Sequence, residues 1–352
     1  MPSHGLGGDA AAAARNWADG LGMDALLAIF HRLDHIDILW SVEYVCSTWR
    51  RAARDEPSLW RRITMRGHEG MVWWLNRSGV ACEAVRRSAG QCEAFCGEYA
   101  GDDGFLVYLS EQAPCLKSLR LISCNGVTDE GIAEAVKELP LLEELELSHC
   151  YNVLGISEVY EVAGEVCPLL KRFRFSKHRF DVNIRSIPNA FQGIASMHGL
   201  RSLQPFGCDL NNDDLETILD SCPHLESLDI RHCFNVNMDD GTLPLKCARI
   251  KTVRGPDDHT DDYDLRVESP IRTPIPPIRF GVRSGCPCHS SYSLSDGEDD
   301  SDDSSWDDSD YYRTNLDDDS DFSDEPSSYE IDLDEKYDKM LPSSMRTFLK
   351  LK

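Results

Sequence analysis

The sequence lacks the features that define several common protein classes. No apolar run approaches the roughly 20 residues of a membrane-spanning helix, so we expect no membrane partner. Lys and Arg number 36 against 61 Asp and Glu, and the net charge of −25 disfavours binding to nucleic acid. Residues 1–15 lack the apolar core of a secretory signal. We therefore expect a soluble protein of the cytoplasm or nucleus.

Signatures of catalysis and of metal binding are also missing. The sequence has no phosphate-binding glycine loop, serine elbow or zinc-protease motif, so we expect a non-catalytic protein without a cofactor. Its 14 cysteines are scattered through a long chain, and we interpret them as reduced thiols. Cys286, Cys288 and His289 have no second ligand pair nearby, so we predict no metal site there.

Residues 16–65 are the first segment with the pattern of a folded unit, after a flexible leader at 1–15. Two apolar stripes with helical spacing follow one another, and Pro57 begins a third short turn. The first stripe consists of Leu26, Ile29, Phe30 and Leu33, and the second of Ile38, Val42, Val45, Cys46 and Trp49. About 45 residues cannot bury much surface by themselves, so we expect a partner to cover part of it.

This segment resembles an F-box in a run that includes Val45-Cys46-Ser47-Thr48-Trp49-Arg50 and Pro57-Ser58-Leu59-Trp60. The resemblance implies binding to a Skp-type adaptor and, through it, to a cullin. Where the family has Leu-Pro, this chain has Leu21-Gly22, and the freer glycine is expected to weaken adaptor binding by about 1 kcal/mol. The candidate adaptor-binding residues are Leu21, Leu26, Ile29, Leu33, Val45, Cys46 and Trp49. The sequence does not divide those that touch the adaptor from those that form the core behind it.

A second pattern, Leu-x-x-Leu-x-Leu-x-x-Cys, recurs between Cys115 and Val236, after an expected linker at 66–89. Regular copies end at Cys124, Cys150 and Cys233, and the copies that begin at Leu170 and Leu200 are irregular. The starts are 25 to 30 residues apart, which is the period of leucine-rich repeats. The cysteine positions resemble the cysteine-containing repeats of many F-box proteins. We therefore predict an α/β fold, with an N-terminal helical F-box and a short leucine-rich-repeat solenoid, a horseshoe arc, over residues 90–255.

In such an array each short strand alternates inward leucines with residues that line the concave face. Adjacent strands carry opposite charges or polar groups along this row. The charges either pair laterally and stabilise the sheet, or they dock a polar segment of a protein target. The candidate target-binding residues are Arg120, Glu146, Arg174, Gln204, Asp229 and Arg231. We interpret His149, His178 and His232, which follow the strands, as surface or turn residues.

Proline interrupts one copy of the repeat. Pro205 stands where the third inward leucine belongs and has no amide hydrogen for a central strand, so we expect a bulge or register shift there. We hypothesise that this kink shapes a target pocket.

The last hundred residues differ in composition from the repeats. Of the 61 Asp and Glu residues, 20 fall between Asp296 and Asp338, where aliphatic residues are few. Such a segment cannot bury enough apolar area to order itself, so we expect a disordered acidic tail over 256–352. It is either a solvating tail or an electrostatic arm for a basic partner.

Two functions are compatible with these patterns. The resemblance implies the substrate-recognition subunit of an SCF-type ubiquitin ligase, in which the F-box binds the adaptor and the repeats bind a protein target. The alternative is a non-ligase repeat scaffold, or an acidic chaperone-like protein that binds basic partners through its tail. Adaptor and cullin binding discriminate between them.

Overall fold

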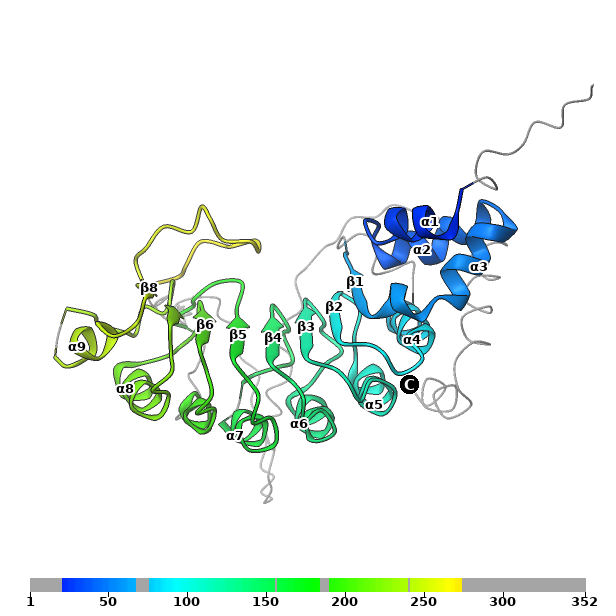
Figure 1. Cartoon of the computed structure of the whole chain (residues 1–352). Coiled ribbons are helices and arrows are strands. Elements are labelled where there is room, and N and C mark those ends of the chain that lie inside the picture. The colour runs from blue at the N-terminus through cyan, green and yellow to red at the C-terminus, as the bar shows by residue number, and fades with distance from the viewer. Residues whose placement is uncertain (1–20, 68–75, 156, 184–189, 240, 274–352) are drawn as a thin grey trace, which may run out of the picture.

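The computed structural model describes residues 21–67, 76–155, 157–183, 190–239 and 241–273. They form a curved array of strands and helices with a helical bundle at its N-terminal end, shown in blue (Figure 1). This confirms the predicted fold class of an F-box followed by a leucine-rich-repeat arc. In the described ranges no helix is long and apolar enough to span a bilayer. The predicted leader, most of the acidic tail and the Cys286–His289 cluster lie outside these ranges.

The N-terminal bundle is held by a small aromatic core. Phe30 and Trp49 meet edge to face, with ring centroids 5.2 Å apart. Asp34 caps the second helix by accepting a hydrogen bond of 2.9 Å from the Ile36 amide. The bundle contains α1 (Met23–Phe30), α2 (His35–Trp40), η2 (Val42–Tyr44), α3 (Ser47–Asp55) and η3 (Pro57–Trp60).

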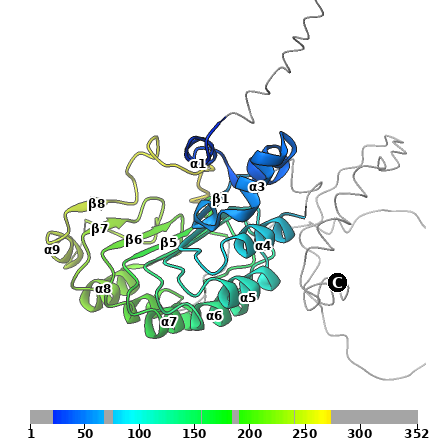
Figure 2. The same cartoon turned by 45° about the vertical axis from the view of Figure 1, so that its right-hand side comes forward.

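A parallel sheet lines the inside of the arc. Each strand pairs with the next one along the chain, and the order is β1 to β8 (Figure 2). The strands are β1 (Arg62–Met65), β2 (Ala94–Glu98), β3 (Ser118–Ile122), β4 (Glu144–Ser148), β5 (Arg172–Ser176), β6 (Ser202–Phe206), β7 (Ser227–Asp229) and β8 (Thr252–Arg254). Strand β1 belongs to the segment predicted as the F-box, so the sheet starts about thirty residues before the predicted boundary at residue 90.

Helices cover the convex side of the sheet: α4 (Arg77–Arg87), α5 (Asp103–Gln112), α6 (Asp129–Lys137), α7 (Ser157–Val166), η5 (Gln192–Ser196), α8 (Asn212–Ser221) and α9 (Leu243–Cys247). Helix α4 contradicts the predicted linker at 66–89. Its residues Val80, Ala84 and Val85 are fully buried, and α4 lies beside α5 as the first convex helix. The linker prediction failed because the segment lacks the leucine template, although small residues such as Ala81 and Ala84 are fully buried.

The repeat cysteines have the buried position that their spacing predicts. Each thiol donates to a carbonyl of the preceding repeat, for example Cys124 to Gly97 at 3.4 Å and Cys150 to Leu121 at 3.6 Å. Cys208 occupies the same position in the copy that begins at Leu200 and donates to Phe175. The repeat pattern predicts an irregular copy there and does not single out Cys208, although Cys208 follows Leu200 by the same eight residues that separate Leu116 from Cys124.

The expected bulge at Pro205 is absent from the pairing of β5 with β6. These strands stay in register through Phe175 and Pro205 and as far as Phe206, and Pro205 is buried in place of the missing leucine. The proline instead affects the pairing of β6 with β7, which is limited to Ser202 and Leu203. Proline has no amide hydrogen to extend that ladder, so it shortens one pairing without shifting the register. The hypothesis of a target pocket shaped by a kink therefore loses its structural basis.

Candidate functional site

The bundle leaves several large apolar side chains uncovered. Met23, Ile29, Tyr44 and Val45 are each between 39 and 57 % exposed, and all four lie between residues 23 and 45 of the F-box segment. We call these four residues the F-box face. Large exposed apolar groups gathered in one short segment are typical of surfaces that a partner covers.

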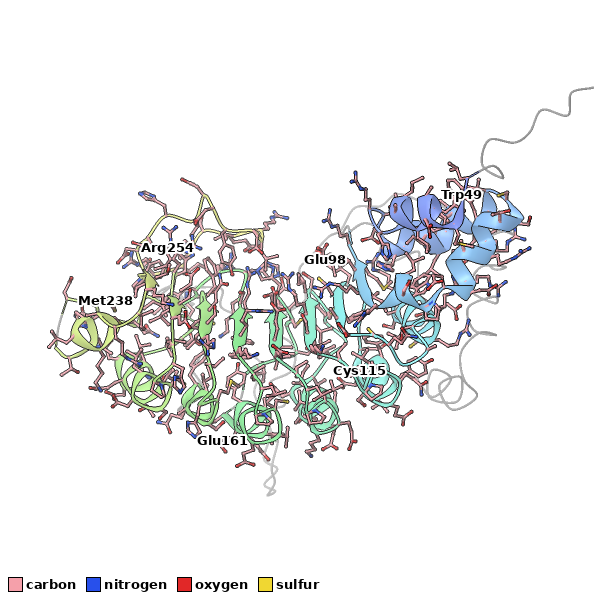
Figure 3. The ribbon with its side chains drawn as sticks, viewed as in Figure 1. Trp49, Glu98, Cys115, Glu161, Met238 and Arg254 are labelled. Carbon is pink, nitrogen blue, oxygen red and sulfur yellow. The ribbon has the colours of Figure 1, made fainter. Side chains whose placement is uncertain are left out.

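The structure divides the seven candidate adaptor-binding residues by burial. Ile29 and Val45 are exposed on the F-box face. Leu26 and Trp49 are buried in the bundle, so they support that face and do not form it. Figure 3 labels Trp49 within the helical bundle. The remaining three, Leu21, Leu33 and Cys46, are partly buried against the core. Met23 and Tyr44 were missed, because helical periodicity selects the stripe that packs inward.

A buried charge cluster joins the bundle to the repeat array. The Arg87 guanidinium on α4 forms ion pairs with Glu43 of the bundle and with Glu83 of its own helix, and all three side chains are at most 8 % exposed. The guanidinium also lies over the Trp60 ring, 5.1 Å from its centroid. Buried charges are tolerated only when paired, so this cluster holds the bundle and α4 in one relative position.

A buried histidine makes a second connection between the bundle and the sheet. The His35 ring lies within 3.2 Å of the Leu59 and Thr64 carbonyl oxygens. The Thr64 amide donates to Nδ1 of His35, and Nε2 lies 3.1 Å from the Leu59 carbonyl oxygen. Burial lowers the pKa of His35. These buried contacts therefore tie the bundle directly to the first strand and the first convex helix of the arc.

Lateral charge pairing on the concave face is confirmed. Glu146 on β4, which is buried, accepts a hydrogen bond from Arg120 on β3 and lies 3.5 Å from Arg174 on β5. On the next pair of strands, the Gln204 amide donates to Asp229 at 3.0 Å. The row of paired side chains is interrupted between β5 and β6, where Arg174 and Gln204 are neighbours. Arg174 instead binds a residue outside the sheet.

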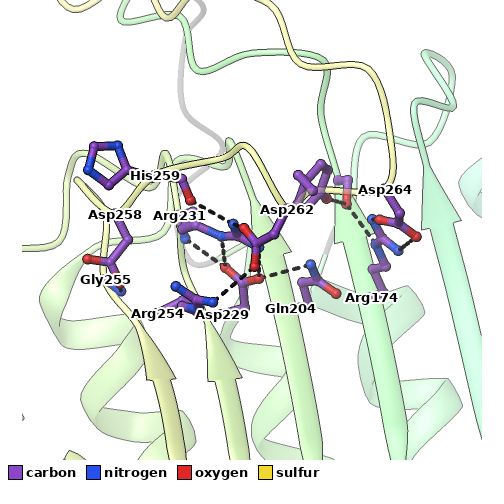
Figure 4. Close-up of polar contacts among 12 residues, drawn as sticks. Arg174, Gln204, Asp229, Arg231, Arg254, Gly255, Asp258, His259, Asp262 and Asp264 are labelled. Atoms are coloured by element: carbon purple, nitrogen blue, oxygen red, sulfur yellow. Dashed lines mark hydrogen bonds and ion pairs between the residues drawn. The ribbon is translucent and has the colours of Figure 1, made fainter.

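That partner belongs to the chain after β8. Residues 256–273, which we call the strap, run back over the carboxyl-terminal ends of β7, β6 and β5 (Figure 1). Arg174 donates two hydrogen bonds to Asp264, one of 2.9 Å from Nη1, and Arg231 and Arg254 both bind Asp262 (Figure 4). These hydrogen bonds lower the pKa of Asp264 and of Asp262 below the usual range. The predicted disordered tail therefore does not begin at residue 256.

Tyr263 anchors the middle of the strap. Its ring stacks on Phe206, with centroids 4.1 Å apart, and its hydroxyl lies 2.7 Å from Ser176 Oγ. The guanidinium carbons of Arg174 and Arg231 lie 4.9 and 5.3 Å from the ring centroid. Burial raises the pKa of Tyr263 to about 12. The strap thus covers the concave face at β5–β7.

The candidate target-binding residues are consequently in two environments. Arg120 and Glu146 lie outside the strap contacts, whereas Arg174, Asp229 and Arg231 lie under or beside the strap. Arg231 is only 4 % exposed and also donates to the His259 carbonyl at 2.8 Å. Sequence reasoning missed the strap because its charge pattern matches that of the acidic tail, and the only local signal was the aromatic ring of Tyr263 between two aspartates.

One of the three histidines after the strands, His149, is more buried than expected, whereas His178 and His232 are half-buried. His149 is 5 % exposed, and its ring stacks on His178 with centroids 3.8 Å apart. Burial, followed by the nearby His178 and Arg174, lowers the pKa of His149 to about 3. His149 also has a left-handed φ of 57°, and Ser123, at the same place in the repeat before it, has a left-handed φ of 54°. In the described part of the chain, no group of three or more His, Cys, Asp or Glu could hold a metal ion.

Two solved structures with leucine-rich-repeat-like similarity to this chain are distant in sequence. A chain of the yeast Rad7–Elc1 complex aligns with a TM-score of 0.37 at 15 % identity, over 66 % of this chain and 67 % of that chain. The leucine-rich-repeat protein LegL7 from Legionella pneumophila aligns with the same TM-score at 12 % identity, over 60 % of this chain and 70 % of that chain.

Sequence relatives are much closer. The F-box-like family model matches residues 23–66. The F-box protein SKIP19 of Arabidopsis thaliana is 39 % identical over 71 % of this chain and 80 % of its own length. The putative F-box/LRR-repeat protein 22 is 37 % identical over 72 % and 81 %, and protein 23 is 38 % identical over 70 % and 55 %, all from the same plant. The chain thus spans about half the length of the last relative. With the bundle and arc described above, these matches show that the chain belongs to the F-box/leucine-rich-repeat proteins, which in general are SCF substrate-recognition adaptors.

Proposed function

We propose that this chain is the substrate-recognition subunit of an SCF-type ubiquitin ligase. In this proposal the F-box face binds a Skp-type adaptor and, through it, a cullin, while the concave side of the arc binds a protein target for ubiquitination. The observation that carries it is the F-box face, where Met23, Ile29, Tyr44 and Val45 remain exposed on a bundle that is otherwise well packed.

The rigid connection between bundle and arc supports the same proposal. An F-box subunit contributes proximity, because it raises the concentration of the target near the transferred ubiquitin. A bound target keeps a constant position only if the two surfaces cannot rotate against each other. The buried Arg87–Glu43 pair and the His35 hydrogen bonds across to β1 supply that rigidity.

The test is co-purification of the full chain with a Skp-type adaptor and a cullin. The double substitution Ile29→Asp and Val45→Asp places two charges on the F-box face, and we expect it to abolish adaptor binding. Val107→Asp is the matched control, since Val107 is 51 % exposed on convex helix α5. If the double variant binds adaptor as well as the control does, the F-box face is not the docking surface.

The rival is a repeat scaffold or acidic chaperone-like protein that works outside a ligase. Its defining segment, residues 296–338, lies outside the described ranges. If the wild-type chain recovers neither adaptor nor cullin and instead recovers basic proteins in a salt-sensitive way, the rival is favoured. Adaptor binding without cullin indicates an F-box protein that works outside a ligase.

Targets are best captured with the double variant just described. Deleting residues 16–65 would also remove β1, which is the first strand of the sheet and covers Phe95 on β2. Ile29→Asp with Val45→Asp keeps the sheet intact and removes only the adaptor contact. Proteins that accumulate on this variant and depend on Arg120 or Glu146 are candidate targets.

A further inference from the structure

The strap binds the arc as a short linear peptide binds a receptor. Within the described residues, the backbone hydrogen bonds of 257–267 are local ones, from Asp258 to Gly255 and from Tyr263 to Thr260. Backbone bonds to the arc occur only at its ends, from His232 to Pro256 and between 268–271 and 178–182. Its middle is held by strap side chains and by one hydrogen bond from the Arg231 side chain to the His259 carbonyl, with no backbone–backbone bond to the arc among the described residues.

Three consecutive residues, 262–264, make most of the side-chain contacts between the strap and the arc. Asp262 and Asp264 are 54 and 58 % exposed on their outer sides, yet each binds a guanidinium that is at most 13 % exposed. Tyr263 lies between them and fills the space bounded by Phe206, Arg174 and Arg231.

The receiving surface is built from the arc and not from the strap. Arg174 lies on β5, Phe206 ends β6 and Arg231 follows β7, so neighbouring repeats present them at fixed spacing. Asp229 holds the Arg231 guanidinium from below with hydrogen bonds of 3.0 and 2.8 Å. Two oriented guanidinium groups on either side of an aromatic surface suit an aromatic residue flanked by carboxylates.

From these contacts we propose that this surface is a binding site for an acidic, tyrosine-containing linear segment of a target protein, and that the strap occupies it in cis. The inference rests on the proposed function and deepens it, because it specifies the kind of target segment that the arc recognises. A target segment must displace 262–264 from Arg174 and Arg231, while the two ends of the strap remain attached.

The cis strap has a high effective concentration, so wild-type protein binds an external segment weakly. A tether of this length gives an effective concentration on the order of millimolar. A target with a single matching segment therefore competes poorly, and one that also contacts the uncovered Arg120 region competes well. The strap thus selects for targets that contact both halves of the concave face.

The first experiment measures binding of a fluorescent peptide with the sequence of residues 257–268. The full-length protein is made with the strap released by Asp262→Asn, Tyr263→Ala and Asp264→Asn together. We expect this variant to bind the peptide at least tenfold more tightly than wild type, and not to bind a peptide carrying the same three substitutions. Equal binding to both proteins, or no binding to a folded released variant, overturns the inference.

A matched pair of substitutions tests the arc side of the site. Placed in the released variant, Arg174→Gln is expected to weaken peptide binding at least tenfold. Arg172→Gln is the control, because Arg172 lies two residues earlier on the same strand and face and pairs with Glu144 at 3.1 Å. Equal losses from the two substitutions would indicate a general charge effect and no defined site.

A measurement on the wild-type protein keeps the inference testable if the released variant does not fold. An excess of the 257–268 peptide with Phe in place of its Tyr is added, and iodination of Tyr263 is followed by mass spectrometry. We expect the buried ring to become reactive, and continued protection overturns displacement. Adaptor binding is measured in parallel. If the protein binds the peptide but not the adaptor, the proposed ligase role is wrong and the peptide site stands. If it binds the adaptor but not the peptide, the peptide site is wrong and the ligase role stands.

Discussion

At the scale of single residues, Arg87 connects the F-box bundle to the repeat array through buried ion pairs. Arg87→Ala leaves Glu43 and Glu83 buried without their shared cation. We expect a loss of about 3–5 kcal/mol in the free energy of unfolding, measured by urea denaturation. Arg86→Ala is the control, since Arg86 also binds Glu83 but its side chain is 50 % exposed, and its loss should be under about 1 kcal/mol.

His149 gives the protein a dependence of stability on pH. Its pKa is near 3 when folded and near 6.5 when unfolded, so the unfolded chain binds more protons between these values. This share of the stability is present above pH 6.5 and is lost as the pH falls towards 3. Between pH 7 and pH 5 we expect a loss of about 2 kcal/mol from this residue, measured as the change in the free energy of unfolding.

The variant His149→Asn isolates this contribution. Asparagine tolerates the left-handed φ of 57° at this position and does not titrate. The variant should lose less stability than wild type over the same pH interval, even if its stability at pH 7 is lower. Identical pH dependence in the two proteins would show that His149 is not responsible.

At the scale of one helix, the entry to α1 explains how the family's Leu-Pro is replaced here by Leu21-Gly22. Gly22 caps α1 with φ −66° and ψ 155°, a backbone conformation that proline favours, and an added Cβ meets nothing within 4 Å. We expect Gly22→Pro to stabilise the bundle by about 0.4–1 kcal/mol, because it restricts the unfolded chain.

The same substitution should raise adaptor affinity if ordering of α1 limits binding. A gain of 0.4–1 kcal/mol corresponds to about two- to fivefold in the dissociation constant, measurable by calorimetry with the purified adaptor. Gly22→Ala is the control, since it fills the same open space without fixing φ and should give a smaller gain. A decrease in affinity with proline would show that the glycine has a role of its own.

At the scale of the whole molecule, the bundle and arc share one sheet, so they should not fold as separate domains. A fragment of residues 90–273 would lose β1 and α4 and expose Phe95, Leu106 and other buried groups of the first repeats. We expect it to aggregate or to melt well below a fragment of residues 21–273, by circular dichroism. Equal melting temperatures would support the boundary at residue 90 that the repeat pattern predicts.

Part of this architecture follows from sequence alone. A spacing such as Leu116, Leu119, Leu121 and Cys124 leaves a strand few alternatives, because the inward positions must alternate and the cysteine must fit a tight turn. The lateral row of Arg120, Glu146 and Arg174 follows directly from that register. Likewise the F-box pattern identified the bundle without any structure.

Tertiary structure decided what periodicity leaves open. It placed Trp49 in the core and Val45 at the surface, since both satisfy a helical stripe and only packing distinguishes them. The strap was beyond sequence reasoning for a different reason. Asp264 reaches Arg174 across 90 residues of chain, and no local pattern records which carboxylate a distant guanidinium will meet when the arc curves. The sequence thus determined the repeats, through short-range spacing, whereas the accessible part of the concave face was decided by long-range contacts that exist only in the folded chain.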